Sequence, residues 1–160
     1  MKPVYRGILT GALQCLIVLS VAGKYAVDRA TLPRVWVKAS APIDPSLWLR
    51  GRYLSLSLQV EIPEGGRDYY QSVRLHAEGG RLIATPEPNG HGLTVSRIRQ
   101  QPWTLTQPVA FYLPEHAAGP SRLKPGEELW VEVSVPHNGP PRPLRLAIRK
   151  GGNLMPLPSP

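Results

Sequence analysis

Few of the residues that commonly carry out chemistry stand at spacings that favour a reaction. Glu127 and Glu128 are adjacent, so in a strand their carboxylates point to opposite faces and make a poor acid–base pair. Spacings of 15, 25 and 21 residues separate the four histidines, which are His76, His91, His116 and His137. None of these spacings matches the i, i+2 or i, i+4 pair of a local metal site. We therefore predict no catalytic residue, no metal site and no cofactor.

The composition narrows the class of protein further. The chain has 160 residues, a net charge of +8, 19 prolines, 15 glycines and one cysteine. This frequency of proline and glycine excludes a helical bundle or coiled coil, and one cysteine excludes an internal disulfide framework or a multi-cysteine zinc site. The basic residues are not interleaved with aromatic residues as in known nucleic-acid modules, so we expect no nucleic-acid partner.

The arginines form a separate candidate site. Arg145 and Arg149 fall on one face of a predicted strand, and Arg97 and Arg99 share a face of another. Such faces attract anionic headgroups or envelope polymers. Binding of an anionic lipid or polymer is therefore one alternative function.

The N-terminus carries an uncharged, mostly apolar run. Gly7 to Gly23 contains no charged residue over 17 positions, and Tyr5 and Tyr25 stand on either side of it. A helix of this length reaches about 25 Å, close to the short limit for crossing a bilayer, and aromatic residues favour the two interfaces. We predict a transmembrane signal-anchor helix at residues 1–25. A cleaved signal peptide is the alternative, because Ser20-Val21-Ala22 offers small residues at a cleavage spacing.

Two features of the sequence predict opposite orientations of this helix in the membrane. More basic residues follow the run than precede it, which by charge alone keeps the C-terminal part in the cytoplasm. Long C-terminal domains cross regardless of flanking charge, and the terminus resembles a signal sequence. We expect export of the C-terminal domain.

The rest of the chain is dominated by alternation with a period of two. In Tyr53 to Ile62, aliphatic residues alternate with polar ones, which predicts a strand with one buried face. Glu128 to Val135 and Pro143 to Arg149 repeat the pattern around a proline- and glycine-rich turn, and we expect them to form a hairpin. Weaker patterns predict five further strands, at Arg34–Ser40, Val73–Ala77, Arg81–Thr85, Leu93–Arg99 and Pro108–Leu113. Glu78-Gly79-Gly80 predicts a tight hairpin between the second and third of these.

These patterns predict a mainly β protein, with a small antiparallel barrel or sandwich after one N-terminal membrane helix. Residues 26–40 are expected to form a linker and first strand, residues 41–154 the β domain, and residues 155–160 a flexible tail. A single helical turn is also predicted at Pro114 to Ala118.

Two short segments carry a resemblance to a known family. Ala41 to Leu56, with Asp44, Arg50, Gly51, Tyr53 and Leu56, resembles the signature of the GDYXXLXY domain family, a group of small bacterial membrane-anchored proteins of unestablished biochemical function. Arg52 replaces the Asp of that motif, and Leu58 replaces its final Tyr. A second landmark, an aromatic pair before Pro and Glu, is matched by Phe111, Tyr112, Pro114 and Glu115.

The resemblance implies a mostly β domain that faces the bacterial envelope, tethered to the inner membrane and often beside a polytopic membrane protein. We expect a non-enzymatic interaction or accessory module, with the lipid bilayer and a membrane protein as partners and the C-terminal domain in the periplasm. The expected contact residues are Asp44, Arg50, Gly51, Arg52, Tyr53, Leu56, Phe111, Tyr112, Pro114 and Glu115.

A signal-peptidase-like serine hydrolase is the remaining alternative. Ser40 and Ser46 precede Gly51, and the order of serine, glycine and hydrophobic strand resembles that of such enzymes. The lysines that follow are Lys124 and Lys150, and neither stands in a strand context that desolvates a catalytic base. A turn role for Ser46 explains its position more simply.

Overall fold

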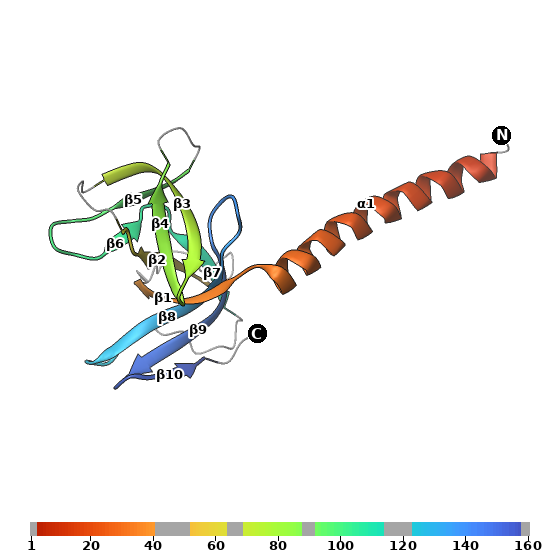
Figure 1. Cartoon of the computed structure of the whole chain (residues 1–160). Coiled ribbons are helices and arrows are strands. Elements are labelled where there is room, and N and C mark those ends of the chain that lie inside the picture. Colours follow the sequence, from red (N-terminus) through yellow and green to blue (C-terminus); the bar gives the residue numbers. More distant parts are fainter. Residues whose placement is uncertain (1–2, 41–51, 64–68, 88–91, 114–122, 158–160) are drawn as a thin grey trace. The chain divides into compact units, whose positions relative to one another are not determined.

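A helix and a β domain make up the protein (Figure 1). The computed structural model describes residues 3–40, 52–63, 69–87, 92–113 and 123–157. The chain divides into two compact units, Met1–Leu32 and Pro33–Pro160. Each unit is described by itself.

The first unit is helix α1, Pro3–Thr31. Within it, Gly7–Asp28 is a 22-residue stretch of mean hydropathy 1.6 with no part buried. The helix continues past the predicted anchor into the segment predicted to be a linker, and its last backbone bond runs from the Leu32 N–H to the Asp28 carbonyl. Pro33 then prevents a further turn. The helix is long and apolar enough to cross a membrane or to serve as a signal sequence.

The second unit is a β domain whose strands form one ten-stranded sheet. The strands are β1 (Arg34–Ser40), β2 (Arg52–Val60), β3 (Tyr69–Glu78), β4 (Arg81–Pro86), β5 (Leu93–Ser96), β6 (Trp103–Leu105), β7 (Val109–Leu113), β8 (Glu127–Ser134), β9 (Arg142–Lys150) and β10 (Asn153–Pro156).

The sheet is antiparallel and curved into a half-barrel. Its order is β10-β9-β8-β1-β2-β6-β5-β3-β4, with β7 also paired to β2. β6 and β7 pair with successive parts of β2, at Val60↔Trp103 and Leu56↔Val109. The far strand β4 returns to the end of β2 through a bridge between Glu61 and Ile83. The predicted mainly β fold behind an N-terminal helix is confirmed.

Strand β2 shows why this sequence folds as it does. Its aliphatic residues Leu54, Leu56, Leu58 and Val60 are all buried, whereas the polar residues Ser55, Ser57 and Gln59 between them are partly exposed. Alternating residues of a strand lie on opposite faces, so the apolar set forms a continuous surface. That surface joins the core with residues from both ends of the sheet, such as Val131 and Val95.

Both predicted hairpins are present. β8 and β9 pair from Glu127↔Lys150 to Ser134↔Arg142, with a bulge after Glu132. β3 and β4 pair up to Glu78↔Arg81, so Gly79 and Gly80 form a two-residue turn. Both glycines have positive φ, 55° and 77°, which residues with a Cβ rarely adopt.

Three details of the predicted strands are wrong. β5 ends at Ser96, so Arg97 and Arg99 lie in the following loop rather than on a shared strand face, and Arg99 has a positive φ of 54°. Met155 and Pro156 belong to β10 and pair with β9, so this part of the predicted tail is ordered in the sheet. The short strand β6 was not predicted, because three residues are too few to show alternation.

Replacing Leu56 by alanine tests whether this residue is part of the core. Leu56 is fully buried, so L56A is expected to lower the free energy of unfolding by about 2–5 kcal/mol. The control is Leu123→Ala, at an exposed leucine, which should change it by less than about 1 kcal/mol. Urea unfolding followed by tryptophan fluorescence measures both. Equal effects of the two substitutions contradict the assignment of Leu56 to the core.

Candidate functional site

The predicted contact residues divide into described and undescribed positions. Asp44, Arg50, Gly51, Pro114 and Glu115 lie outside the described residues. Of the others, Arg52 and Tyr53 begin β2, where they pair with Leu113 and Tyr112 of β7. The described parts of the two landmark segments are therefore adjacent antiparallel strands, although the paired residues Tyr53 and Tyr112 are 59 positions apart along the chain.

The side chains of these two strands serve different purposes. Leu56 is fully buried and Phe111 is 7% exposed, so both belong to the core and cannot touch a partner at the surface. Tyr112, on the opposite face of β7, is 71% exposed. Of Leu56, Phe111 and Tyr112, Tyr112 is therefore the residue whose side chain reaches the surface.

Three of the four arginines predicted to attract anions are already engaged. Arg145 donates to a Glu132 oxygen from Nε at 2.6 Å and lies 5.9 Å from the centre of the Trp36 ring. Arg149 lies over the Trp130 ring at 5.0 Å, and Arg97 over the Trp103 ring at 4.8 Å. Guanidinium groups held by a carboxylate or an aromatic ring are less free to bind a polyanion.

Arg145 and Arg149 do share one face, as predicted, and ion pairs and ring contacts connect the side chains of that face. We call it the Trp–Arg face. Register places its residues in three rows across β1, β8 and β9: Trp36, Glu132 and Arg145; Lys38, Trp130 and Ala147; then Glu128 and Arg149. Three basic residues stand against two acidic ones, which leaves one net positive charge. This balance weakens the case for a strongly anion-binding surface.

Glu128, in the last of these rows, contacts Lys38 and Trp130 of the row beside it. It accepts a hydrogen bond from Lys38 Nζ at 2.6 Å and another from the Trp130 indole at 3.1 Å. These bonds, the one from Lys38 above all, lower the pKa of Glu128 because they favour the carboxylate. The hydrogen bond and charge of Glu132 likewise raise the pKa of Arg145. The ion pairs fix the tryptophan rings between charged side chains.

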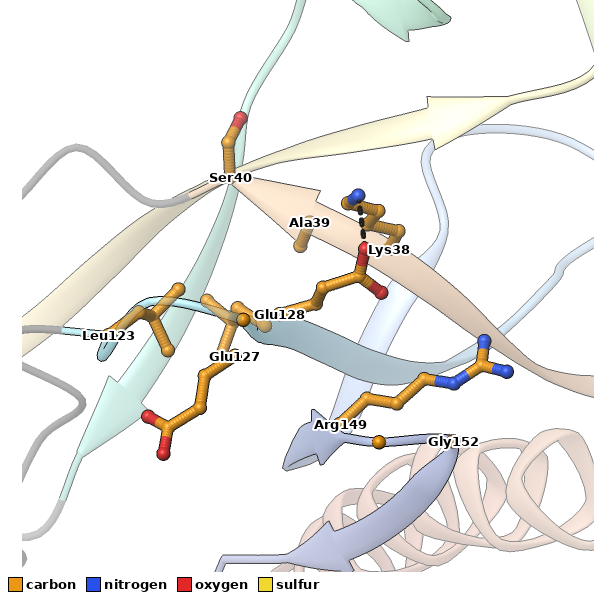
Figure 2. Close-up of a pocket in the computed structure, with 11 residues that line it drawn as sticks. Lys38, Ala39, Ser40, Leu123, Glu127, Glu128, Arg149 and Gly152 are labelled. Carbon is orange, nitrogen blue, oxygen red and sulfur yellow. Dashed lines mark hydrogen bonds and ion pairs between the residues drawn. The ribbon is translucent and has the colours of Figure 1, made fainter.

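A shallow groove of about 720 Å³ lies at one end of the face, where β1 ends and β8 begins (Figure 2). Its lining includes Lys38, Ser40, Glu127, Glu128 and Arg149. Figure 2 shows Glu127 and Glu128 pointing in opposite directions, as the sequence predicted. Glu127 accepts from the Lys124 N–H at 3.0 Å and lies 3.4 Å from Lys150 Nζ. The Lys124 N–H in particular lowers the pKa of Glu127.

The groove does not assemble the serine and lysine that a hydrolase needs. Ser40 points away from the Lys38–Glu128 pair (Figure 2). Lys124 is exposed, and Lys150 is exposed and paired with Glu127, so neither lysine is desolvated as a catalytic base must be. Ser46 lies outside the described residues. Within the described ranges, no three His, Cys, Asp or Glu side chains gather as metal ligands.

Sequence reasoning missed the tryptophans of this face. Trp36 and Trp130 alternate with buried valines in β1 and β8, which is the signal that assigns them to the outer face. Trp130 meets Arg149 across the predicted hairpin of β8 and β9. Trp36 meets Arg145 only because β1 pairs with β8, more than 90 residues later, and nothing local in the sequence indicates that pairing.

Comparison with known proteins adds no assignment. No protein-family model matches the chain, and no match is found among curated proteins or solved structures. The resemblance to the GDYXXLXY domain family therefore stays a prediction.

The hydrogen bonds to Glu128 predict a pH-dependent stability. Because the folded pKa of Glu128 lies below its ordinary value of 4.5, the folded state favours the carboxylate. This contribution is complete above about pH 4.5 and is lost as the pH falls through the folded pKa. The free energy of unfolding should therefore fall on acidification, and less so in Glu128→Gln. Urea unfolding at pH 7, 5 and 3 measures the difference.

Lys38→Met provides the matched variant, because it removes the main cause of the lowered pKa. It should also flatten the pH dependence, and the double variant should be no flatter than Glu128→Gln alone. Independent, additive effects of the two substitutions would show that the pair is not coupled.

Proposed function

We propose that this chain is a single-pass membrane protein whose β domain has no catalytic role and acts as an interaction module for a membrane protein or envelope component. The observation that carries the proposal is the apolar surface of α1. Side chains such as Leu16, Val18 and Leu19 are 65–70% exposed. Within the described residues the protein provides no cover for them, and a lipid bilayer is the environment that does.

The dimensions of the helix support this proposal. The 22 residues of Gly7–Asp28 extend about 33 Å, which matches a hydrocarbon core of about 30 Å. Ser20 satisfies its hydroxyl within the helix by donating to the Ile17 carbonyl at 2.8 Å. A hydroxyl bonded in this way adds little to the cost of insertion. The same features suit a signal sequence, so retention of the helix is part of what the experiment must establish.

The β domain supports the second half of the proposal. It has a core of its own, drawn from strands across the whole sheet. Its described carboxylates at Glu61, Glu127, Glu128 and Glu132 each bind a basic side chain. Carboxylates held in cross-strand ion pairs support strand pairing, which is a structural role and not a catalytic one. With the implied family resemblance, these features favour a tethered module in the bacterial inner membrane with its C-terminal domain in the periplasm.

Membrane retention is the first test. The full chain should remain in the membrane pellet after alkaline carbonate washing, and Leu16→Arg/Ile17→Arg should shift it to the soluble fraction. Each arginine near the centre of a span costs about 2.5–3.5 kcal/mol. The control is Ile98→Arg, at an exposed loop residue of the β domain, which should stay in the pellet. Release of the unmodified chain, or its recovery without residues 1–25, contradicts an anchor.

The orientation of the domain has its own test. With the C-terminal domain in the periplasm, alkaline phosphatase fused after Pro160 should be active and green fluorescent protein at the same position should be dark. Inverting the flanking charge with Lys2→Glu/Arg6→Glu should reduce phosphatase activity, because basic residues favour the cytoplasmic side. The reverse pattern of reporters would place the domain in the cytoplasm.

A further inference from the structure

A second groove lies where strands β1 and β2 separate. β1 pairs with β8 from Arg34 to Lys38, but with β2 only at Ala39 and Ser40. The two strands diverge beyond that point, and a groove of about 420 Å³ opens between Trp36–Lys38 and Gln59–Glu61. Residues Arg81 and Leu82 of β4 also line it. With Trp130 of β8, its lining residues come from four strands.

Aromatic and apolar surface dominates one side of this groove. Trp36 and Trp130 both line it, and they come from the neighbouring strands β1 and β8. Pro102 adds further apolar surface, whereas Leu82 is 3% exposed and belongs to the core. Arg145 and Arg149 lie over the two tryptophan rings, but both rings stay partly exposed beside them. The exposed part of a flat, rigid ring supplies contact area at a low entropic cost to a ligand.

The carboxylates in and beside the groove have hydrogen-bond partners, whereas two of its donor side chains have none in the described part of the chain. Its acidic group Glu61 binds Arg81 at 3.2 Å, and beside the groove Glu128 accepts from Lys38 and Trp130. By contrast, no hydrogen bond is formed by the Trp36 indole N–H or the Gln59 amide in the described part of the chain. The groove thus has donors to offer, while its strongest acceptors are occupied.

We propose that this groove binds an extended, proline-rich peptide segment of a partner protein. Such a segment adopts a polyproline II helix, whose backbone carbonyls have no internal partners, and each proline lacks an N–H. It therefore presents acceptors and apolar rings with few donors, which matches the groove. Aromatic-lined grooves bind this conformation at a low entropic cost.

A neutral glycan is the less suitable ligand. Each sugar hydroxyl brings a donor along with its acceptor, and Glu61 and Glu128, which would receive those donors, already bind basic side chains. The ion pairs also leave the groove without a large net charge, so a strongly charged ligand has no counterpart. The inference rests on the proposed function only for its partner: a proline-rich peptide can bind whether or not α1 remains attached to the membrane.

Binding is tested with the full chain in detergent micelles and a fluorescein-labelled decapeptide of proline, followed by fluorescence anisotropy. The expected result is saturable binding, with a glycine–serine decapeptide binding at least about tenfold more weakly. Trp36→Phe keeps an aromatic ring but removes the indole donor, and should weaken binding roughly 2- to 10-fold. Gln59→Leu should have a similar effect, and Trp36→Ala a larger one.

The matched control is Met155→Ala, which removes a half-exposed apolar side chain from β10 and should leave the affinity unchanged. The near-ultraviolet circular dichroism of each variant checks that it is folded, and Trp36→Phe decides the matter if Trp36→Ala unfolds. Absent binding of the proline peptide, or binding that is indifferent to Trp36→Phe and Gln59→Leu, overturns the proposal. So does binding of maltohexaose in its place, since a glycan would then be the ligand.

Discussion

The burial of one face of β2 is the constraint on which the β domain depends. This strand pairs with β1 on one side and with β6 and β7 on the other, and its end bridges to β4. Its four aliphatic residues contribute to a core shared by strands from both ends of the sheet. A shift of one residue in its register would turn all of them toward water, so the alternation fixes the register of its neighbours as well.

The outer surface is organised by a different kind of interaction. On the Trp–Arg face, each carboxylate is bound by a base from a neighbouring strand, and the arginines cover the tryptophan rings. Cross-strand pairs of this kind add to strand pairing without adding to the core. The sequence alone assigns the arginines of this face to anion binding, but here they contact a carboxylate and tryptophan rings. The attraction of this face for a polyanion is therefore weaker than the net charge of +8 suggests.

The sequence predicted those features that are encoded locally. Three such features each depend on one short stretch of sequence, and all three are found: the alternation of Leu54 to Val60, the Gly79-Gly80 turn and the apolar N-terminal run. It did not predict β6 or β10, which are too short to show a period. It also could not predict the groove between β1 and β2, because that groove depends on where two strands stop pairing. Leu56 shows the limit of motif reasoning, since a motif position served the core rather than the surface.

The connection between the two units has a mechanical consequence. Helix α1 ends at Thr31 and β1 begins at Arg34, so two residues separate them. β1 lies inside the sheet, hydrogen-bonded to β8 along most of its length and to β2 at its end. A force applied to the helix is therefore transmitted directly to β1, whose first five residues are held by β8 alone. The β1–β8 ladder bears that load before the two pairs with β2 at Ala39 and Ser40 do, so separation of β1 from β8 is the first step by which pulling on the helix would open the domain.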